Sequence, residues 1–115
     1  MKKILFISTC MFVYMYSYSQ SQVKDMTTVL FENDKIKVIK YVSNPGKDVC
    51  GKGTHTHPAH LDIAMTDIIG TETGKNGKTE KFTLKKGEVY WNKPVTHVAL
   101  NKGSKPAILY IVEPK

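Results

Sequence analysis

Apolar and polar residues alternate in short runs along most of the chain, which is the pattern of strands that bury one face. The clearest run is residues 35–42, where lysine alternates with branched apolar residues over the first half. Similar runs predict strands at residues 27–32, 61–69, 79–84, 88–91, 96–100 and 107–112. Turn residues separate the runs, and Asn76-Gly77 is the pair most typical of a two-residue hairpin turn. With no helical period of apolar positions among them, the runs predict an all-β sandwich or barrel.

The last predicted strand differs from the others because both of its faces are apolar. Residues 107–112 read Ala-Ile-Leu-Tyr-Ile-Val. A closed barrel buries only one face of each strand, so the second apolar face needs another partner. We therefore expect a homodimer.

The first residues have a different layout. Lys2 and Lys3 precede an apolar run at residues 4–16, and small polar residues follow it. This order is typical of a secretory signal peptide, and the run is shorter than the ~20 residues of a membrane-spanning helix. We expect a signal peptide at residues 1–19 and a single domain at residues 20–115, located in the periplasm or secreted, with no stable membrane span after cleavage. A retained N-terminal anchor is the alternative.

The formal net charge is +7, and all 17 basic residues are lysines spread along the chain. A protein that reads nucleic acid would be expected to cluster its basic residues and to include arginine. We therefore expect a lysine-rich surface and no nucleic-acid partner. Cys50 is the only cysteine of the expected mature chain, which excludes an intramolecular disulfide there. It is either a small buried apolar residue or a soft ligand or redox group at the site described next.

The four histidines lie on two short segments, at His55, His57, His60 and His97. Side chains alternate between the faces of a strand, so His55 and His57 point the same way and can clamp a metal ion. With His97 and the nearby carboxylate of Asp62, they predict one mononuclear metal site. His60 is an additional imidazole, and we assign it either to the surface or to the surroundings of the site, as a supporting partner, a surplus ligand or a proton shuttle.

Both segments resemble the two sequence motifs of the cupin superfamily. The first motif is glycine, five residues, His-x-His, three or four residues, glutamate, six residues, glycine; this chain has His55-Thr-His57, four residues, Asp62, seven residues, Gly70. The second motif is glycine, five residues, Pro-x-Gly, two residues, histidine, three residues, asparagine; this chain has Gly87, six residues, Pro94, two residues, His97, three residues, Asn101. The resemblance covers nearly all of the expected mature chain, and the His-x-His-Pro segment is similar to the germin branch.

The resemblance implies a single-domain jelly-roll β-barrel in which His55, His57 and His97 are the histidine ligands. Asp62 stands at the position of the glutamate ligand, where its shorter side chain binds the metal directly, binds it through a water, or orients a histidine. The chain departs from the motifs in two glycines, the one that opens the first motif and the one of Pro-x-Gly.

Three imidazoles and a carboxylate suit one divalent transition metal ion, and iron, manganese, nickel, copper and zinc all remain open. Such a ligand set leaves a position for water, dioxygen or a chelating small molecule. The resemblance therefore implies an exported metal-binding cupin that binds or acts on a small oxygenated molecule, with dioxygenase-like or isomerase-like chemistry as one expectation. The alternative is a non-catalytic module that binds metal or a small ligand.

Overall fold

The computed structural model describes residues 23–115, so the expected signal peptide lies outside the described residues. This part of the chain forms nine strands and no helix, and hence no apolar helix long enough to cross a membrane. In chain order the strands are β1 (Met26–Glu32), β2 (Ile36–Ser43), β3 (His55–His57), β4 (His60–Ala64), β5 (Ile68–Gly74), β6 (Thr79–Leu84), β7 (Val89–Asn92), β8 (Val95–Asn101) and β9 (Ala107–Pro114). The all-β prediction is confirmed.

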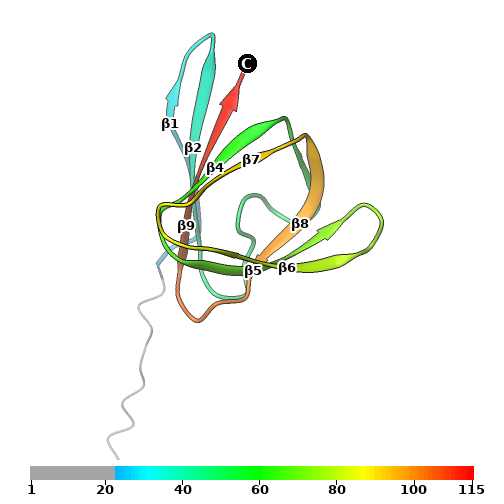
Figure 1. Cartoon of the computed structure of the whole chain (residues 1–115). Coiled ribbons are helices and arrows are strands. Elements are labelled where there is room, and N and C mark those ends of the chain that lie inside the picture. Colours follow the sequence, from blue (N-terminus) through cyan, green and yellow to red (C-terminus); the bar gives the residue numbers. More distant parts are fainter. Residues whose placement is uncertain (1–22) are drawn as a thin grey trace, which may run out of the picture.

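The strands form two antiparallel sheets that face each other as the walls of a flattened barrel (Figure 1). One sheet has the strand order β1-β2-β9-β4-β7, and the other has the order β3-β8-β5-β6. The chain crosses repeatedly from one sheet to the other, for example between β4 and β5 and between β7 and β8. This connectivity is that of a jelly roll, so the predicted barrel is confirmed as well.

The prediction of one strand at residues 61–69 is wrong, because the chain changes sheets within it. β4 and β5 are separated by a corner at residues 65–67. Distant backbone groups fix this corner: Met65 N–H donates to Ile108 O (2.9 Å), and Ile108 N–H donates to Thr66 Oγ1 (3.0 Å). β5 also extends past residue 69, the predicted end of the strand, and therefore includes the carboxylate of Glu72.

The apolar core lies between the two sheets. Its buried members are Val49, Cys50, Ala64, Ile68, Ala99, Ala107, Leu109 and Ile111. The last three come from one face of β9, whereas Ile108, Tyr110 and Val112 on the other face are half-buried. The two apolar faces of β9 are therefore unequal, and only the inner one belongs to the core.

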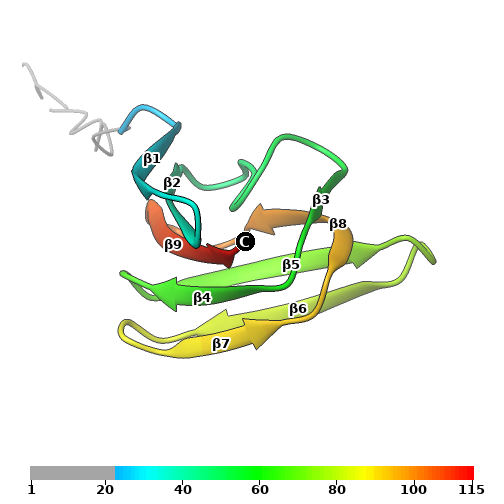
Figure 2. The ribbon, with the colours of Figure 1, turned by 90° about the horizontal axis from the view of Figure 1, so that it is seen from above.

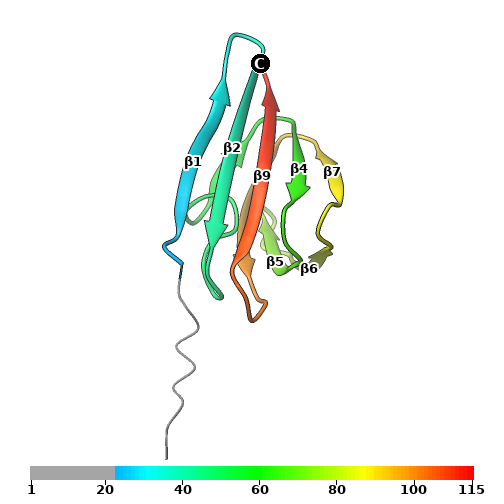
Figure 3. The same ribbon diagram turned by 90° about the vertical axis from the view of Figure 1, so that its left-hand side faces the viewer.

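The two edges of the five-stranded sheet carry exposed apolar side chains. β1 lies at one edge, next to β2, and β9 follows on the other side of β2 (Figure 3). Val29 and Phe31 on β1 are 49% and 54% exposed. β7 forms the opposite edge, where Tyr90 and Trp91 are similarly exposed. Apolar surface of this kind on a free strand edge favours association with another chain.

Candidate metal centre

The pairing of β3 with β8 brings the two histidine segments together. His55 lies directly opposite His97 in this pair, and Thr56 lies opposite Thr96. The two threonine hydroxyls hydrogen-bond to each other at 2.9 Å on the other face, which supports the register. The ring centroid of His55 is therefore only 4.7 Å from that of His97 and 4.5 Å from that of His57.

Cys50 reaches the same place from the segment between β2 and β3, which loops back before it enters β3 (Figure 2). Val49 N–H donates to Ala99 O at 2.9 Å, so this segment runs beside β8 just ahead of β3. Cys50 Sγ then lies 3.4 Å from His55 Nε2 and 3.5 Å from His97 Nε2. Four side chains therefore cluster here, and their possible ligand atoms all lie within 4.8 Å of one another: Cys50, His55, His57 and His97.

The loop also fixes the ring of His55. Gly51 has a φ of +149° and packs so closely on this ring that a Cβ atom there would lie 2.8 Å from it. His55 Nδ1–H donates to the carbonyl oxygen of Gly53 at 2.8 Å. Because a carbonyl oxygen can only accept, the hydrogen sits on Nδ1 and the lone pair of Nε2 is directed toward Cys50.

His97 is oriented in the same way by a carboxylate. Its Nδ1–H donates to Glu72 Oε1 at 2.6 Å, which leaves Nε2 facing Cys50. Glu72 lies on β5 opposite Ala99, and Ala99 is two residues from His97 on the same face of β8. Glu72 was not foreseen from the sequence because the predicted strand ended at residue 69. The signal available was the spacing Gly70, Glu72, Gly74, which continues one face of that strand.

His57 is the most deeply buried of the three imidazoles. It is 4% exposed, and its Nε2 atom has no hydrogen-bond partner. Burial, together with the neighbouring imidazoles, lowers the pKa of His57 to about 4. Burial also lowers the pKa of His55. Both rings are therefore neutral at pH 7, which is the form in which histidine binds a metal.

Asp62 lies outside this cluster. Asn92 Nδ2 donates to Asp62 Oδ2 at 2.6 Å, and His60 Nε2 lies 3.2 Å from Asp62 Oδ1. His60 is 2% exposed, so it is not a surface residue, and its Nδ1–H donates to Pro58 O at 2.7 Å. Burial lowers the pKa of His60, but the contacts with Asp62 and Pro58 outweigh it and the net pKa is raised. Direct metal binding by Asp62 thus stays a prediction.

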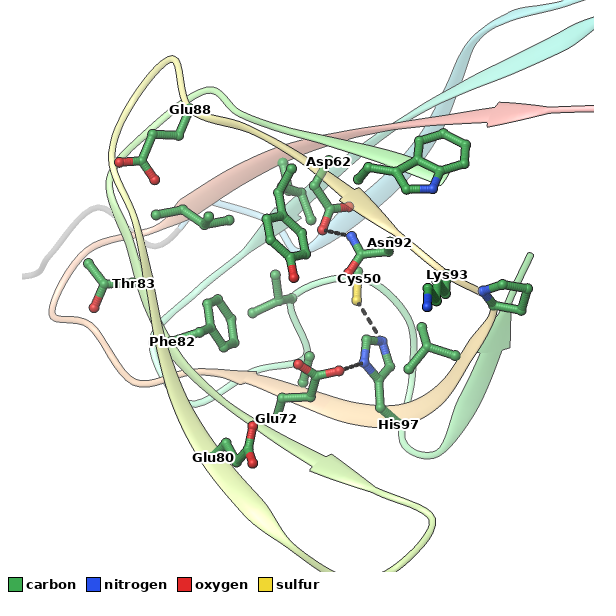
Figure 4. Close-up of a pocket in the computed structure, with 18 residues that line it drawn as sticks. Cys50, Asp62, Glu72, Glu80, Phe82, Thr83, Glu88, Asn92, Lys93 and His97 are labelled. Atoms are coloured by element: carbon green, nitrogen blue, oxygen red, sulfur yellow. Dashed lines mark hydrogen bonds and ion pairs between the residues drawn. The ribbon is translucent and has the colours of Figure 1, made fainter. Parts of the chain in front are cut away.

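A cavity of about 730 Å³ opens beside the cluster, within the range of small-molecule pockets. Cys50 and His97 lie next to each other in its lining, with Asp62 and Asn92 on one side and Glu72 on the other (Figure 4). Apolar and aromatic side chains form most of the remaining wall, together with Glu80, Thr83, Glu88 and Lys93. Cavity and cluster together offer imidazole, thiol, carboxylate and amide groups to a small bound molecule.

The fold is a jelly roll, and the cluster of histidines and a cysteine in it could hold a metal ion. No family model and no curated protein matches the sequence. The structure is similar to a cupin domain from Bordetella pertussis Tohama I, with a TM-score of 0.71 and 22% identity over 82% of this chain and 99% of that one. It is also similar to an RmlC-like cupin family protein with a double-stranded β-helix fold from Methanocaldococcus jannaschii, with a TM-score of 0.63 and 14% identity over 90% and 92% of the two chains. At these identities the likeness establishes the fold.

Proposed function

We propose that this protein is an exported cupin that holds one divalent transition metal ion on His55, His57 and His97 and binds or acts on a small oxygenated molecule in the adjacent cavity. The observation that carries the proposal is the convergence of three imidazoles from two distant segments, with the lone pairs of His55 and His97 turned inward. The buried Nε2 of His57, which lacks a hydrogen-bond partner, fits the same role. A metal bound there would act as a Lewis acid toward an oxygen atom of the bound molecule.

The chain's own residues would position that molecule. Asn92 and Asp62 present amide and carboxylate groups at the cavity wall, suited to hydroxyl or carbonyl groups. The buried pair of His60 and Asp62 can hold a proton next to them. Glu72 fixes the ring of His97. These roles support either catalysis or reversible binding.

Elemental analysis tests the metal. The protein is purified without chelators and without a metal-binding tag, beside His55→Ala and His97→Ala. We expect about one equivalent of metal in the wild type and loss from both variants. Absence of metal from all three proteins, even after reconstitution with zinc, iron or manganese, contradicts the proposal.

A non-catalytic metal-binding module is the second candidate, and the presence of Cys50 in the cluster favours it. Four protein ligands are enough to complete tetrahedral coordination, as in structural sites, whereas catalytic sites keep an open position. Titration of the cobalt-substituted protein with azide separates the two. A spectral change on azide addition indicates an open position, and an unchanged spectrum indicates a closed one.

We also infer that the mature protein starts near residue 20 and associates as a homodimer. The order of charged, apolar and small residues at positions 1–19 supports export, and N-terminal sequencing of the exported protein tests it. The exposed apolar residues Val29 and Phe31 on the β1 edge support association with a second copy. Light scattering at micromolar concentration is expected to give twice the chain mass, and Phe31→Lys to reduce it. Leu109 and Ile111 are unsuitable for this test because they lie in the core.

A further inference from the structure

We propose that the thiolate of Cys50 is the fourth protein ligand of the metal centre, in the place where the carboxylate of Asp62 is expected from the motif. This inference rests on the proposed metal site. It adds a ligand of a different chemical kind, which changes the metal that the site selects. A small molecule bound to the metal would then be a fifth ligand.

The distances around Cys50 match shared coordination. In tetrahedral zinc sites with Zn–S near 2.3 Å and Zn–N near 2.0–2.1 Å, a sulfur and a nitrogen ligand lie roughly 3.5 Å apart. Cys50 Sγ lies 3.4 Å from His55 Nε2 and 3.5 Å from His97 Nε2. The ligand atom of His57 lies within 4.8 Å of these three atoms. The sulfur therefore already occupies one corner of a plausible coordination shell.

The hydrogen-bond partners of the rings point to the same centre. The Nδ1–H groups of His55 and His97 both donate to oxygen acceptors, Gly53 O and Glu72 Oε1 respectively. Their remaining nitrogens converge on the sulfur, whose single S–H is a weak donor that can serve only one of the two lone pairs, whereas the deprotonated sulfur is a strong metal ligand. A metal ion between these atoms would satisfy both lone pairs and also the unpartnered Nε2 of His57.

Asp62 lies outside this centre, and its carboxylate contacts other residues. Asn92 donates to one of its carboxylate oxygens at 2.6 Å, and His60 lies 3.2 Å from the other. Asn92 and His60 are themselves directly opposite each other in the pair of β4 and β7, so the arrangement is built into the sheet. Asp62 is thus better suited to the bound small molecule than to the metal.

A ligand set of three imidazoles and one thiolate narrows the choice of metal. Thiolate ligands favour zinc and copper, whereas carboxylate and water favour manganese. We therefore expect the purified protein to contain zinc or copper.

Cobalt substitution tests the sulfur bond directly. The protein carries Cys10→Ser, so that Cys50 is the only thiol, and is loaded with Co²⁺ alone beside Cys50→Ser and Asp62→Asn. We expect an intense near-ultraviolet sulfur-to-cobalt charge-transfer band in the parent and in Asp62→Asn, and its loss in Cys50→Ser. We also expect the affinity of Cys50→Ser for Zn²⁺ to fall by more than the about 10- to 100-fold cost of losing a supporting partner.

X-ray absorption at the zinc edge of the parent protein needs no substitution at Cys50, so it covers the case in which Cys50→Ser does not fold. One sulfur scatterer near 2.3 Å is expected beside nitrogen near 2.0–2.1 Å. Bound metal with only nitrogen and oxygen neighbours, or a cobalt complex without the sulfur band, overturns the Cys50 ligand and leaves the three-histidine site intact. Failure of the parent protein to bind Co²⁺, Zn²⁺ or any other divalent transition metal ion, copper included, overturns both proposals.

Discussion

Two of the histidine–carboxylate pairs in the barrel, His97 with Glu72 and His60 with Asp62, differ in which ring nitrogens are occupied. His97 donates from Nδ1 to Glu72 at 2.6 Å and keeps Nε2 turned toward Cys50. His60 donates from Nδ1 to a backbone carbonyl and has its Nε2 3.2 Å from Asp62, so both of its nitrogens are engaged. Only the first arrangement leaves a lone pair for a metal. The partner of each nitrogen therefore distinguishes a ligand from a supporting residue.

The ligand histidine His57 and the supporting histidine His60 also differ in charge state. Burial and three neighbouring imidazoles lower the pKa of His57 to about 4. Burial acts the same way on His60, but the Asp62 carboxylate and the Pro58 carbonyl reverse it and raise its pKa. The cluster thus holds a neutral imidazole, while the second pair favours an imidazolium.

The largest expected effect is on metal binding. His57→Ala removes a ligand, so we expect its Zn²⁺ affinity to fall beyond the roughly 10- to 100-fold range of supporting residues. His60→Gln should retain about one equivalent of metal, but lose roughly 1–3 kcal/mol of stability because it disturbs a buried hydrogen bond. Metal content and chemical denaturation measure the two effects. If both variants lose metal equally, the distinction between the two histidines is wrong.

The next effect concerns stability against pH in the metal-free protein. A histidine whose folded pKa lies below the unfolded value of 6.5, as for His57, stabilises the fold above that pH and loses the contribution as pH falls toward 4. A histidine with a raised pKa, as for His60, stabilises fully below 6.5 and loses its contribution as pH rises through its folded pKa. We expect the free energy of unfolding to peak near pH 6.5.

Two substitutions separate these slopes. His57→Gln should flatten the acid side by roughly 1–3 kcal/mol, since the pKa of His57 is lowered to about 4 and one pKa unit is worth about 1.4 kcal/mol. His60→Gln should flatten the alkaline side, because the pKa of His60 is raised. Urea denaturation in a chelator from pH 4.5 to 8.5 measures them. A change on the same side in both variants would show that the two environments are alike.

Most of the fold could be predicted from the alternation of residues, as for residues 35–42, because a strand with one wet face carries its own pattern. The corner at residues 65–67 could not. The corner contains no glycine or proline, and the hydrogen bonds that bend the chain there involve Ile108, which is distant in sequence. The local alternation of apolar and polar residues carries no information about such long-range contacts.

The part of the candidate site that lies in the two sequence motifs could be predicted. His55, His57 and His97 lie together, whereas the role of Cys50 depended on where a loop without periodicity would run. Its position follows from backbone pairing with β8, which the sequence alone does not specify. Glu72 was missed for a related reason, since its role follows from the pairing of β5 with β8.

A smaller effect is expected from Gly51→Ala, which perturbs the cluster without removing a ligand. The added methyl group would lie 2.8 Å from the ring of His55 and displace it. We expect Zn²⁺ affinity to fall about 10- to 100-fold. Gly46→Ala is the matched control, because Gly46 also has a positive φ of 82° but nothing within 4 Å of an added Cβ. It should cost about 1 kcal/mol of stability and leave the affinity unchanged. Equal Zn²⁺ affinities in both variants would show that the packing of Gly51 on His55 does not affect metal binding.

The smallest effect is expected from Glu72→Gln, which changes only the charge of the group that orients His97. The amide oxygen can still accept the Nδ1–H, so the ring stays in place, but it becomes a weaker ligand without the carboxylate behind it. We expect Zn²⁺ affinity to fall about 10-fold. Glu80→Gln is the matched control, because Glu80 pairs with Glu72 across β5 and β6 and lines the same cavity. A general effect of cavity charge would weaken binding equally in both variants, whereas orientation of His97 weakens it only in Glu72→Gln.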